Sequence, residues 1–297
     1  MPRLPTDVWM ARNDKELETG EYCGEVIMKI AFIGGGNMGE AMLAALLGKK
    51  LCTPADISVS DVSRERLDYL KKEYGVSVTV SNKEAVTGKD IIVLAVKPQS
   101  LPEVLVGMKG GVKSNQLVLS IVAGVKISKI GEGLGHKRIV RSMPNTPARI
   151  GYGVTGWTAT AEVTKEQKES ARTILGAMGK EIYFDGEKYL DMVTAVSGSG
   201  PAYFFLLAEA MIEAGIKIGL GQKEAEELVA QTMLGAAQLL AQPGQSPATL
   251  RQNVTSKGGT TEAALKVFEN GGFSKLVAAA VRAAYDRTRE LGGPAKS

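Results

Sequence analysis

The first half of the chain alternates short apolar runs with segments that carry apolar residues at helical spacing. Residues 29–33 form an apolar run directly before glycines, which is typical of a buried parallel strand. Residues 37–49 place apolar side chains on one helix face. Further strands are expected at 57–59, 76–80, 90–96, 117–122 and 138–141. Such repetition predicts a right-handed parallel sheet covered by helices.

The second half is helical in pattern and rich in alanine, leucine and glutamate. Pro201 suits the first turn of a helix, and Gly219 and Gly221 suit its end. Helices are expected at 202–216, 222–241, 261–269 and 274–291, with a turn at 243–247. Leucines and valines lie on more than one face of these helices, which predicts an obligate homodimer or a larger assembly. We therefore divide the chain into an α/β domain at 28–185 and an all-helical domain at 186–297.

The segment before Met28 has no clear period. Its longest apolar stretch, residues 8–11, is far shorter than the apolar region of a secretory signal, and its five acidic residues between 14 and 25 argue against a transit peptide. We expect residues 1–27 to be a dispensable extension. An arm that packs on the body is the alternative.

Composition excludes several classes of site. The chain has 297 residues and a formal net charge of +4 that is spread along its length, which argues against a nucleic-acid surface. His136 is the single histidine, so a site with two histidine ligands is impossible. Cys23 and Cys52 lack a Cys-x-x-Cys pattern, which fits a reducing cytoplasm without a disulfide scaffold or thiolate zinc site. No apolar run approaches the roughly 20 residues that span a bilayer. We expect no metal and no membrane.

Residues 34–39 contain Gly-x-Gly-x-x-Gly between a predicted strand and a predicted helix. This context is the one that a dinucleotide fingerprint requires, and it predicts a Rossmann-type, doubly wound sheet. Gly34 allows the tight turn, Gly36 lets a pyrophosphate approach the backbone, and Gly39 lets the helix pack closely. A tight turn without ligand is the alternative. The expected cofactor contacts here are Gly34, Gly36, Asn37, Met38 and Gly39.

The choice between NADP(H) and NAD(H) depends on the end of the second strand. Asp61 can bind a ribose 2′-hydroxyl and repel a 2′-phosphate. Ser60, Ser63 and Arg64 could bind that phosphate instead, although Arg64 could equally be a solvated helix residue. These residues leave the preference open.

The end of the fourth strand supplies a second candidate cofactor contact. In open α/β sheets, ligands lie outside the carboxyl ends of the strands. Lys97 there can bind a ribose or a phosphate, and Pro98 turns the main chain. The expected contacts are Ala95, Val96, Lys97 and Pro98. Residues 143–147, with two prolines, predict a fixed wall of a cleft.

A segment rich in hydroxyls and glycine lies between two predicted helices. It suits a small carboxylate, because it combines hydroxyls, adjacent glycines and amides at a helix N-terminus. A capped turn is the alternative, but it needs only one Ser or Thr. The expected substrate contacts are Ser256, Gly258, Gly259, Thr260 and Thr261. Residues 196–201 are a similar break that we interpret as a close-packing point.

The ordered motifs resemble the pyrroline-5-carboxylate reductase family over residues 28–291. The resemblance is carried by residues 32–38, 95–99, 143–148, 197–203 and 253–261, followed by Ala264-Leu265. It implies that NAD(P)H delivers hydride to the imine carbon of 1-pyrroline-5-carboxylate, giving L-proline in the last step of proline biosynthesis. It also implies that the 256–261 loop holds the substrate carboxylate, that Asn253 contacts the cofactor, and that helices interlock into dimers or rings of dimers.

Two positions depart from the family pattern, and the proton donor needs an argument of its own. Lys257 replaces a frequent proline, and Asp61 is less expected in a member that prefers NADPH. Because His136 precedes a sheet strand, we expect the hydroxyl of Thr261 to donate or relay a proton to the imine nitrogen. The alternatives are a related cyclic-imine or small-acid reductase, a noncatalytic dinucleotide-sensing module, and a helical interaction protein.

Overall fold

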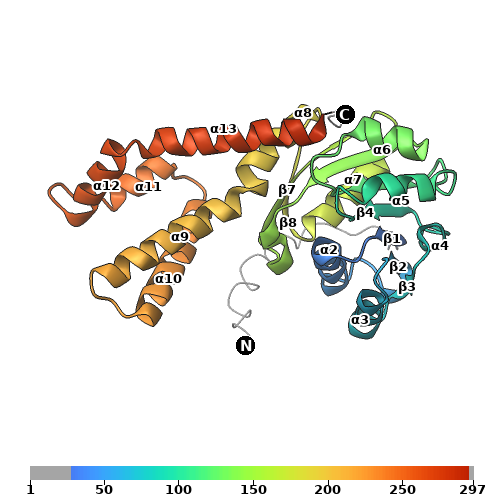
Figure 1. Ribbon diagram of the computed structural model, residues 1–297, viewed down its shortest axis with the longest axis horizontal. Coiled ribbons are helices and arrows are strands. Elements are labelled where there is room, and N and C mark those ends of the chain that lie inside the picture. The colour runs from blue at the N-terminus through green and yellow to red at the C-terminus, as the bar shows by residue number, and fades with distance from the viewer. Residues whose placement is uncertain (1–27, 294–297) are drawn as a thin grey trace.

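The computed structural model describes residues 28–293, which form a sheet region and a long helical arm (Figure 1). Residues 1–27 lie outside the described residues, so their dispensability stays a prediction. The sheet has eight strands in the order β3-β2-β1-β4-β5-β6-β7-β8. Their bounds are β1 Ile30–Ile33, β2 Ile57–Ser60, β3 Ser77–Thr79, β4 Ile91–Leu94, β5 Leu117–Ser120, β6 Ile139–Met143, β7 Gly153–Ala159 and β8 Gly179–Tyr183.

Strands β1 to β6 are parallel, as the alternating pattern predicts. Strand β7 runs antiparallel to β6, and β8 is parallel to β7. The expectation of an entirely parallel sheet is corrected at this edge. The cause is the connection from β6 to β7, which contains only the 3₁₀ helix η3 (Thr146–Ile150), whereas a parallel return needs a crossover of a dozen or more residues.

Helices cover both faces of the sheet. Their bounds are α2 Asn37–Gly48, α3 Arg64–Tyr74, α4 Asn82–Ala85, α5 Leu101–Met108, α6 Ile127–Leu134 and α7 Lys165–Gly176. Alternate residues of β1 enter two separate cores. Ile30 and Phe32 pack in the core that contains α2 and α7, whereas Ala31 and Ile33 pack in the core that contains α5 and α6. The first half is therefore doubly wound.

The strand order reverses between β1 and β4, which both lie in the middle of the sheet. The carboxyl end of β1 leads into the glycine turn, and that of β4 leads into residues 95–98. In doubly wound sheets a ligand binds in the crevice at such a reversal. The fold thus places both predicted cofactor segments at one crevice.

The second half is a helical arm that leaves the sheet and returns to it (Figure 1). Its elements are α8 Lys188–Val193, the π-helical turn η4 Thr194–Gly198, α9 Gly200–Lys217, α10 Gln222–Ala241, α11 Pro247–Asn253, α12 Thr260–Asn270 and α13 Phe273–Gly292. Helix α11 follows the predicted turn and was not itself predicted. Ser246 caps it by accepting a hydrogen bond from the amide of Thr249 at 3.1 Å. Helix α13 runs back from the tip until Gly292 meets Gly124 after β5.

The arm exposes much of its apolar surface in a single protomer. Helix α10 buries only Ala225 and Val229 among 20 residues, and α12 buries none of its residues. The large exposed apolar side chains include Phe204, Phe205, Leu206, Leu228, Leu234, Val267 and Leu276. Lys188–Lys217 is long and apolar enough to cross a bilayer by length and composition, although a single such helix is weak evidence for a membrane. An apolar surface of this extent marks an interaction face.

Candidate active site

The glycine turn after β1 is shaped by close backbone contacts. Gly34 has φ +99°, and a Cβ at this position would lie 2.8 Å from the carbonyl oxygen of Ala95. A Cβ on Gly39 would lie 2.7 Å from the carbonyl oxygen of Gly34. A Cβ on Gly36 would meet nothing within 4 Å. Gly34 and Gly39 are therefore required by packing, and Gly36 faces open space, as the motif predicts.

Helix α2 begins at this turn without a side-chain cap. Gly36 is its N-cap residue, and no side chain accepts from the first-turn amides. Gly36 and Asn37 are exposed, and Met38 is half-buried. The amides of a first helical turn have no partner within the helix and attract anions. The turn can thus hold a pyrophosphate by its backbone.

Asp61 is already engaged within the protein. One carboxylate oxygen accepts from the amide of Gly35 at 2.8 Å, and the other accepts from the amide of Ser63 at 2.9 Å. Arg64 is exposed on the first turn of α3. Ser60 is fully buried, and its hydroxyl lies 2.7 Å from Asn82 Oδ1. A side-chain contact from Ser60 to a nucleotide in the crevice is not supported.

A cluster of side chains behind the glycine turn has no local sequence pattern that predicts it. Arg66 Nε donates to the carbonyl oxygen of Gly35 at 2.5 Å, and its Nη2 donates to Glu40. The hydroxyls of Tyr69 and Tyr74 also donate to Glu40, at 3.0 and 2.9 Å. Burial alone would raise the pKa of Glu40, but hydrogen bonds from Arg66 and the two tyrosines lower it overall. Glu40 and Arg66 are 26 positions apart, so no local pattern could have paired them.

The ends of three further strands meet near this turn. The amide of Ala95 donates to Ile33 at 2.8 Å, and Lys97 and Pro98 are exposed at the same edge. The amide of Ile121, just after β5, donates to Leu94 at 3.1 Å. Residues 121–124 follow β5 at the same edge of the sheet, whereas the sequence pattern assigns residues 121 and 122 to the strand itself. The segment after β6 is fixed: Asn145 is buried and accepts from the amide of Val154 at 3.0 Å.

The predicted carboxylate loop lies before α12. Gly258 has φ +74°, and its amide donates to a carboxylate oxygen of Glu262 at 2.8 Å. The amide of Gly259 donates to the carbonyl oxygen of Ser256 at 3.0 Å. The loop therefore uses the amides of both glycines, which the sequence predicts as substrate contacts, to hold its own shape. The uncapped first-turn amides that remain belong to Thr260, Thr261 and Glu262.

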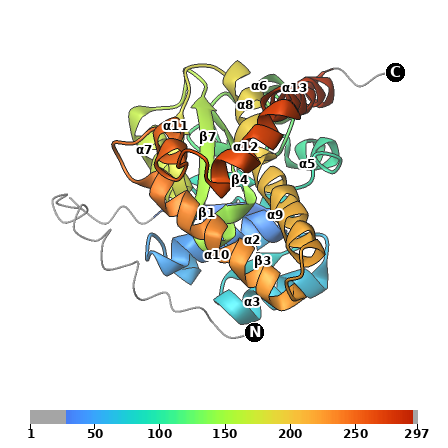
Figure 2. The same cartoon turned by 90° about the vertical axis from the view of Figure 1, so that its left-hand side faces the viewer.

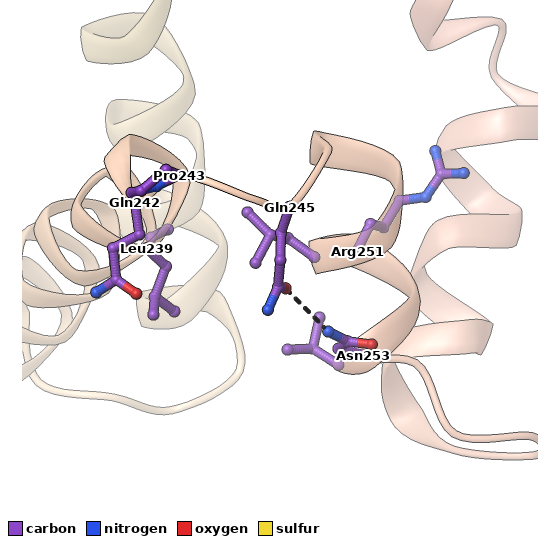
Figure 3. Close-up of a pocket in the computed structure, with 9 residues that line it drawn as sticks. Leu239, Gln242, Pro243, Gln245, Arg251 and Asn253 are labelled. Atoms are coloured by element: carbon purple, nitrogen blue, oxygen red, sulfur yellow. Dashed lines mark hydrogen bonds between the residues drawn. The ribbon is translucent and has the colours of Figure 1, made fainter.

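Asn253 lines a cavity of about 480 Å³ between the end of α10 and α11 (Figure 3). Its side-chain amide donates to Gln245 at 3.2 Å. Leu239, Pro243 and Leu250 supply much of the apolar wall. The residue that the resemblance assigns to the cofactor therefore lies on the arm, next to the carboxylate loop.

Within one protomer, the two predicted halves of the site lie apart. Figure 1 shows α11 and α12 at the far tip of the arm, whereas the glycine turn lies in the sheet region beside α2. Figure 2 looks along the arm and shows its helices in front of the sheet. His136 lies before β6, at the amino edge of the sheet, where it bonds to the carbonyl oxygen of Gln116 at 2.9 Å and where burial lowers its pKa. Among residues 28–293, no group of three or more His, Cys, Asp or Glu side chains could hold a metal.

Comparison with known proteins assigns the family. Residues 187–291 match the family described as pyrroline-5-carboxylate reductase dimerisation, and residues 29–124 match NADP oxidoreductase coenzyme F420-dependent. Pyrroline-5-carboxylate reductase of Pseudomonas aeruginosa is 44% identical over 264 residues, covering 89% of this chain and 96% of that protein. The chain belongs to the pyrroline-5-carboxylate reductase family. The reductase of Synechocystis is 43% identical over 265 residues, covering 89% and 98%.

Solved structures agree with this family and with the fold. A pyrroline-5-carboxylate reductase from Coxiella burnetii has a TM-score of 0.85 at 41% identity, covering 90% of this chain and 99% of that one. A pyrroline carboxylate reductase from Plasmodium falciparum, solved with NADP bound, has a TM-score of 0.80 at 31% identity, covering 90% and 98%. The resemblance read from the motifs is confirmed at the level of the family, and the Rossmann-type sheet with a helical C-terminal region is confirmed as the fold.

Proposed function

We infer that this chain is a pyrroline-5-carboxylate reductase, an oxidoreductase that reduces 1-pyrroline-5-carboxylate to L-proline with NAD(P)H in the last step of proline biosynthesis. The observation that carries this inference is the identity of 44% to a reductase across both the sheet region and the arm. The crevice supports it, since a backbone anion site lies at the strand reversal. When bound, NAD(P)H supplies the hydride, and the protein supplies orientation and electrostatics.

The cofactor contacts proposed for the sheet region are backbone groups at the crevice. The uncapped amides at the start of α2, from Gly36 onward, can hold the pyrophosphate, while the exposed Lys97 can bind a ribose or a phosphate. The proposed set is Gly34, Gly36, Asn37, Met38, Gly39, Ala95, Val96, Lys97 and Pro98. Ser60 is left out because its hydroxyl is buried against Asn82.

NADP(H) is the proposed cofactor, and NAD(H) is proposed as a usable second one. NADP is bound in the Plasmodium relative, which supports the first assignment. The exposed guanidinium of Arg64 is available for a 2′-phosphate. Both carboxylate oxygens of Asp61 accept hydrogen bonds from backbone amides, so Asp61 repels a 2′-phosphate less than a free carboxylate would. These contacts together allow both nucleotides, with NADPH favoured.

The loop at 256–261 is the proposed site for the substrate carboxylate. The first-turn amides at Thr260 and Thr261 and the hydroxyl of Ser256 can hold an anion at the N-terminus of α12. The glycines at 258 and 259 shape the loop. A pyrroline ring held there keeps its imine nitrogen within a few ångströms of Thr261, whose hydroxyl can donate or relay the proton as hydride arrives. Protonation makes the imine carbon the better acceptor.

The active site is proposed to form between two copies of the chain. In one protomer the glycine turn lies in the sheet region and the 256–261 loop lies at the tip of the arm (Figure 1), which supports a site whose two halves come from different copies. The exposed apolar helices of the arm give a surface for a homodimer, and rings of dimers remain part of this proposal. Asn253, beside the loop, would then contact the cofactor of the partner subunit.

The division at residue 185 and a cytoplasmic location complete the proposal. Strand β8 ends at Tyr183 and α8 begins at Lys188, which supports a boundary between them.

The two cysteines form no pairing pattern, which suits a reducing compartment. The apolar helix Lys188–Lys217 is assigned to the dimer surface and not to a membrane. Neither a metal nor a nucleic-acid partner is part of the proposed function.

The test is an assay of the purified protein with 1-pyrroline-5-carboxylate and either NADPH or NADH, followed by loss of nicotinamide absorbance. Turnover to L-proline with both nucleotides is expected. The control is the six-membered cyclic imine acid of the same chemistry. Faster turnover of that control would make the chain a related cyclic-imine reductase, and nucleotide binding without any turnover would make it a dinucleotide sensor.

A further inference from the structure

The middle residue of the glycine turn is held from both sides by the β2-α3 segment. Asp61 accepts from the amide of Gly35 at 2.8 Å, and Arg66 Nε donates to the carbonyl oxygen of the same residue at 2.5 Å. A Cβ on Gly35 would lie 2.6 Å from Leu70 Cδ1, so the backbone is pressed against α3. Both polar groups of Gly35 are therefore fixed by side chains about 30 positions away in sequence.

The bond from Arg66 acts on the next residue through peptide geometry. The carbonyl of Gly35 and the amide of Gly36 belong to one planar peptide, and none of the described peptides is cis. The two groups of a trans peptide point in opposite directions. Since Arg66 holds the carbonyl toward α3, the amide of Gly36 must point away from α3, on the exposed side of the turn. A guanidinium on the carbonyl also polarises the peptide and makes that amide a stronger donor.

Arg66 is itself fixed and charge-paired. Its Nη2 donates to Glu40, and its guanidinium lies 5.0 Å from the centre of the Tyr69 ring. Glu40 in turn accepts from the hydroxyls of Tyr69 and Tyr74. The side chains of Arg66 and Glu40 are only 25% and 20% exposed. A guanidinium held in this way stabilises the conformation of the turn, and it is not available to bind a phosphate directly.

We propose that Arg66 is a positioning residue for the dinucleotide, acting through the Gly35–Gly36 peptide to aim the Gly36 amide at the pyrophosphate, and that Glu40 holds Arg66 in place. This rests on the proposed function, in which the turn binds NAD(P)H. The pyrophosphate is common to both nucleotides, so the loss of Arg66 weakens NADPH and NADH by the same factor. Arg64, the proposed 2′-phosphate ligand, should by contrast discriminate between them.

The experiment is direct nucleotide titration of the full chain, followed by nicotinamide fluorescence without 1-pyrroline-5-carboxylate. The variants are Arg66→Met and Arg66→Lys, with Arg172→Met as the control. Arg172 also pairs with two carboxylates, Glu169 and Glu181, but does so on α7, away from the turn. Both Arg66 variants are expected to raise the Kd of NADPH and of NADH about five- to tenfold, the size of one weakened ordinary hydrogen bond. Lysine keeps the charge but cannot reproduce the Nε and Nη2 bonds together.

Three results would overturn the proposal: an unchanged Kd for both nucleotides, weakening of NADPH alone, or wild-type binding by Arg66→Lys. Weakening of NADPH alone would make Arg66 a direct 2′-phosphate ligand. A merely structural role would lower the number of binding sites and leave their Kd unchanged. In steady state, kcat at saturating nucleotide and KM for the imine should stay at wild-type values. Because the titration needs no imine, it stands even if the wild-type protein fails to turn over 1-pyrroline-5-carboxylate.

Discussion

The sheet region and the helical arm solve the burial of apolar surface in different ways. Helix α2 buries Gly39, Ala41, Met42, Leu43 and Leu46 among 12 residues, whereas α10 buries only Ala225 and Val229 among 20. The sheet region thus completes its two cores within one chain. The arm leaves Phe205 and Leu206 more than 60% exposed, so it does not complete a hydrophobic core within one chain. The difference shows that the arm presents an interaction face, and under the proposed function this face takes a second copy of the chain.

A charged residue on the exposed apolar face of the arm should have the largest effect on assembly and activity. Phe205→Asp places a carboxylate at a side chain that is 68% exposed in the protomer, so the isolated chain loses little. In a dimer the same carboxylate is buried without a partner, which is strongly unfavourable. We expect dissociation to monomers and at least a roughly hundredfold loss of activity, because the site is then incomplete.

Light scattering and turnover at the same protein concentration measure this prediction. Val106→Asp is the matched control, since Val106 is 77% exposed on α5 of the sheet region. That variant should stay dimeric and active. A Phe205→Asp monomer with wild-type turnover would show that one chain holds a whole site.

Thr261→Val tests the proposed chemical role of the loop at the tip of the arm. Valine keeps the shape of threonine but removes the hydroxyl assigned to the imine nitrogen. We expect kcat to fall by at least about tenfold while nucleotide Kd stays constant; the loss is smaller than the roughly hundredfold minimum of general acid catalysis because water can take over part of the role. Stopped-flow or steady-state turnover at saturating NADPH measures it. Near-normal kcat would leave Thr261 as a packing residue and assign the proton to ordered water.

Arg64→Ala tests the exposed edge of the sheet region. Loss of this guanidinium should raise KM for NADPH about three- to tenfold and leave KM for NADH nearly unchanged, because an exposed charge-assisted contact is worth about 1 kcal/mol. Initial rates with each nucleotide measure the two constants. Equal changes in both would dismiss Arg64 as the 2′-phosphate ligand.

Removal of residues 1–27 should have the smallest effect. A chain that starts at Met28 retains every element of both regions, and its melting temperature and kcat are expected to match those of the full chain. Differential scanning calorimetry and the standard assay measure this. A large loss in either value would mean that the segment packs on the body.

The sequence predicted best where one physical rule acts locally. The apolar runs of β1 and β4 and the glycine spacing at residues 34–39 were sufficient to place the crevice. Strand β8 was missed because all of its residues are exposed or half-buried, so it has no apolar run. The edge strand β7 was missed because glycines and threonines interrupt its apolar pattern.

The candidate site shows the same limit. Residue types predicted the anion sites on the turn and on the loop, but hydrogen bonding decided which groups are available. The bond from Gly258 to Glu262 removes one expected donor, and the buried bond of Ser60 to Asn82 removes another. The role of Arg66 could not be predicted because its partners Gly35 and Glu40 are distant from it in sequence. Tertiary contacts of this kind leave no periodic trace.

The most direct test of a site shared between two copies is complementation between two inactive variants. Gly36→Asp adds a carboxylate where the structure has open space and a helix N-cap accepts Asp, so the fold is kept and the pyrophosphate is repelled. Thr260→Asp adds a carboxylate at the exposed start of α12 and repels the substrate. Each variant alone should be inactive. After mixing and reassociation, about half of the dimers are mixed and each has one intact site, so activity should return to about a quarter of the wild-type value. Continued inactivity of the reassociated mixture would contradict the account, because it would place both halves of the site in one chain.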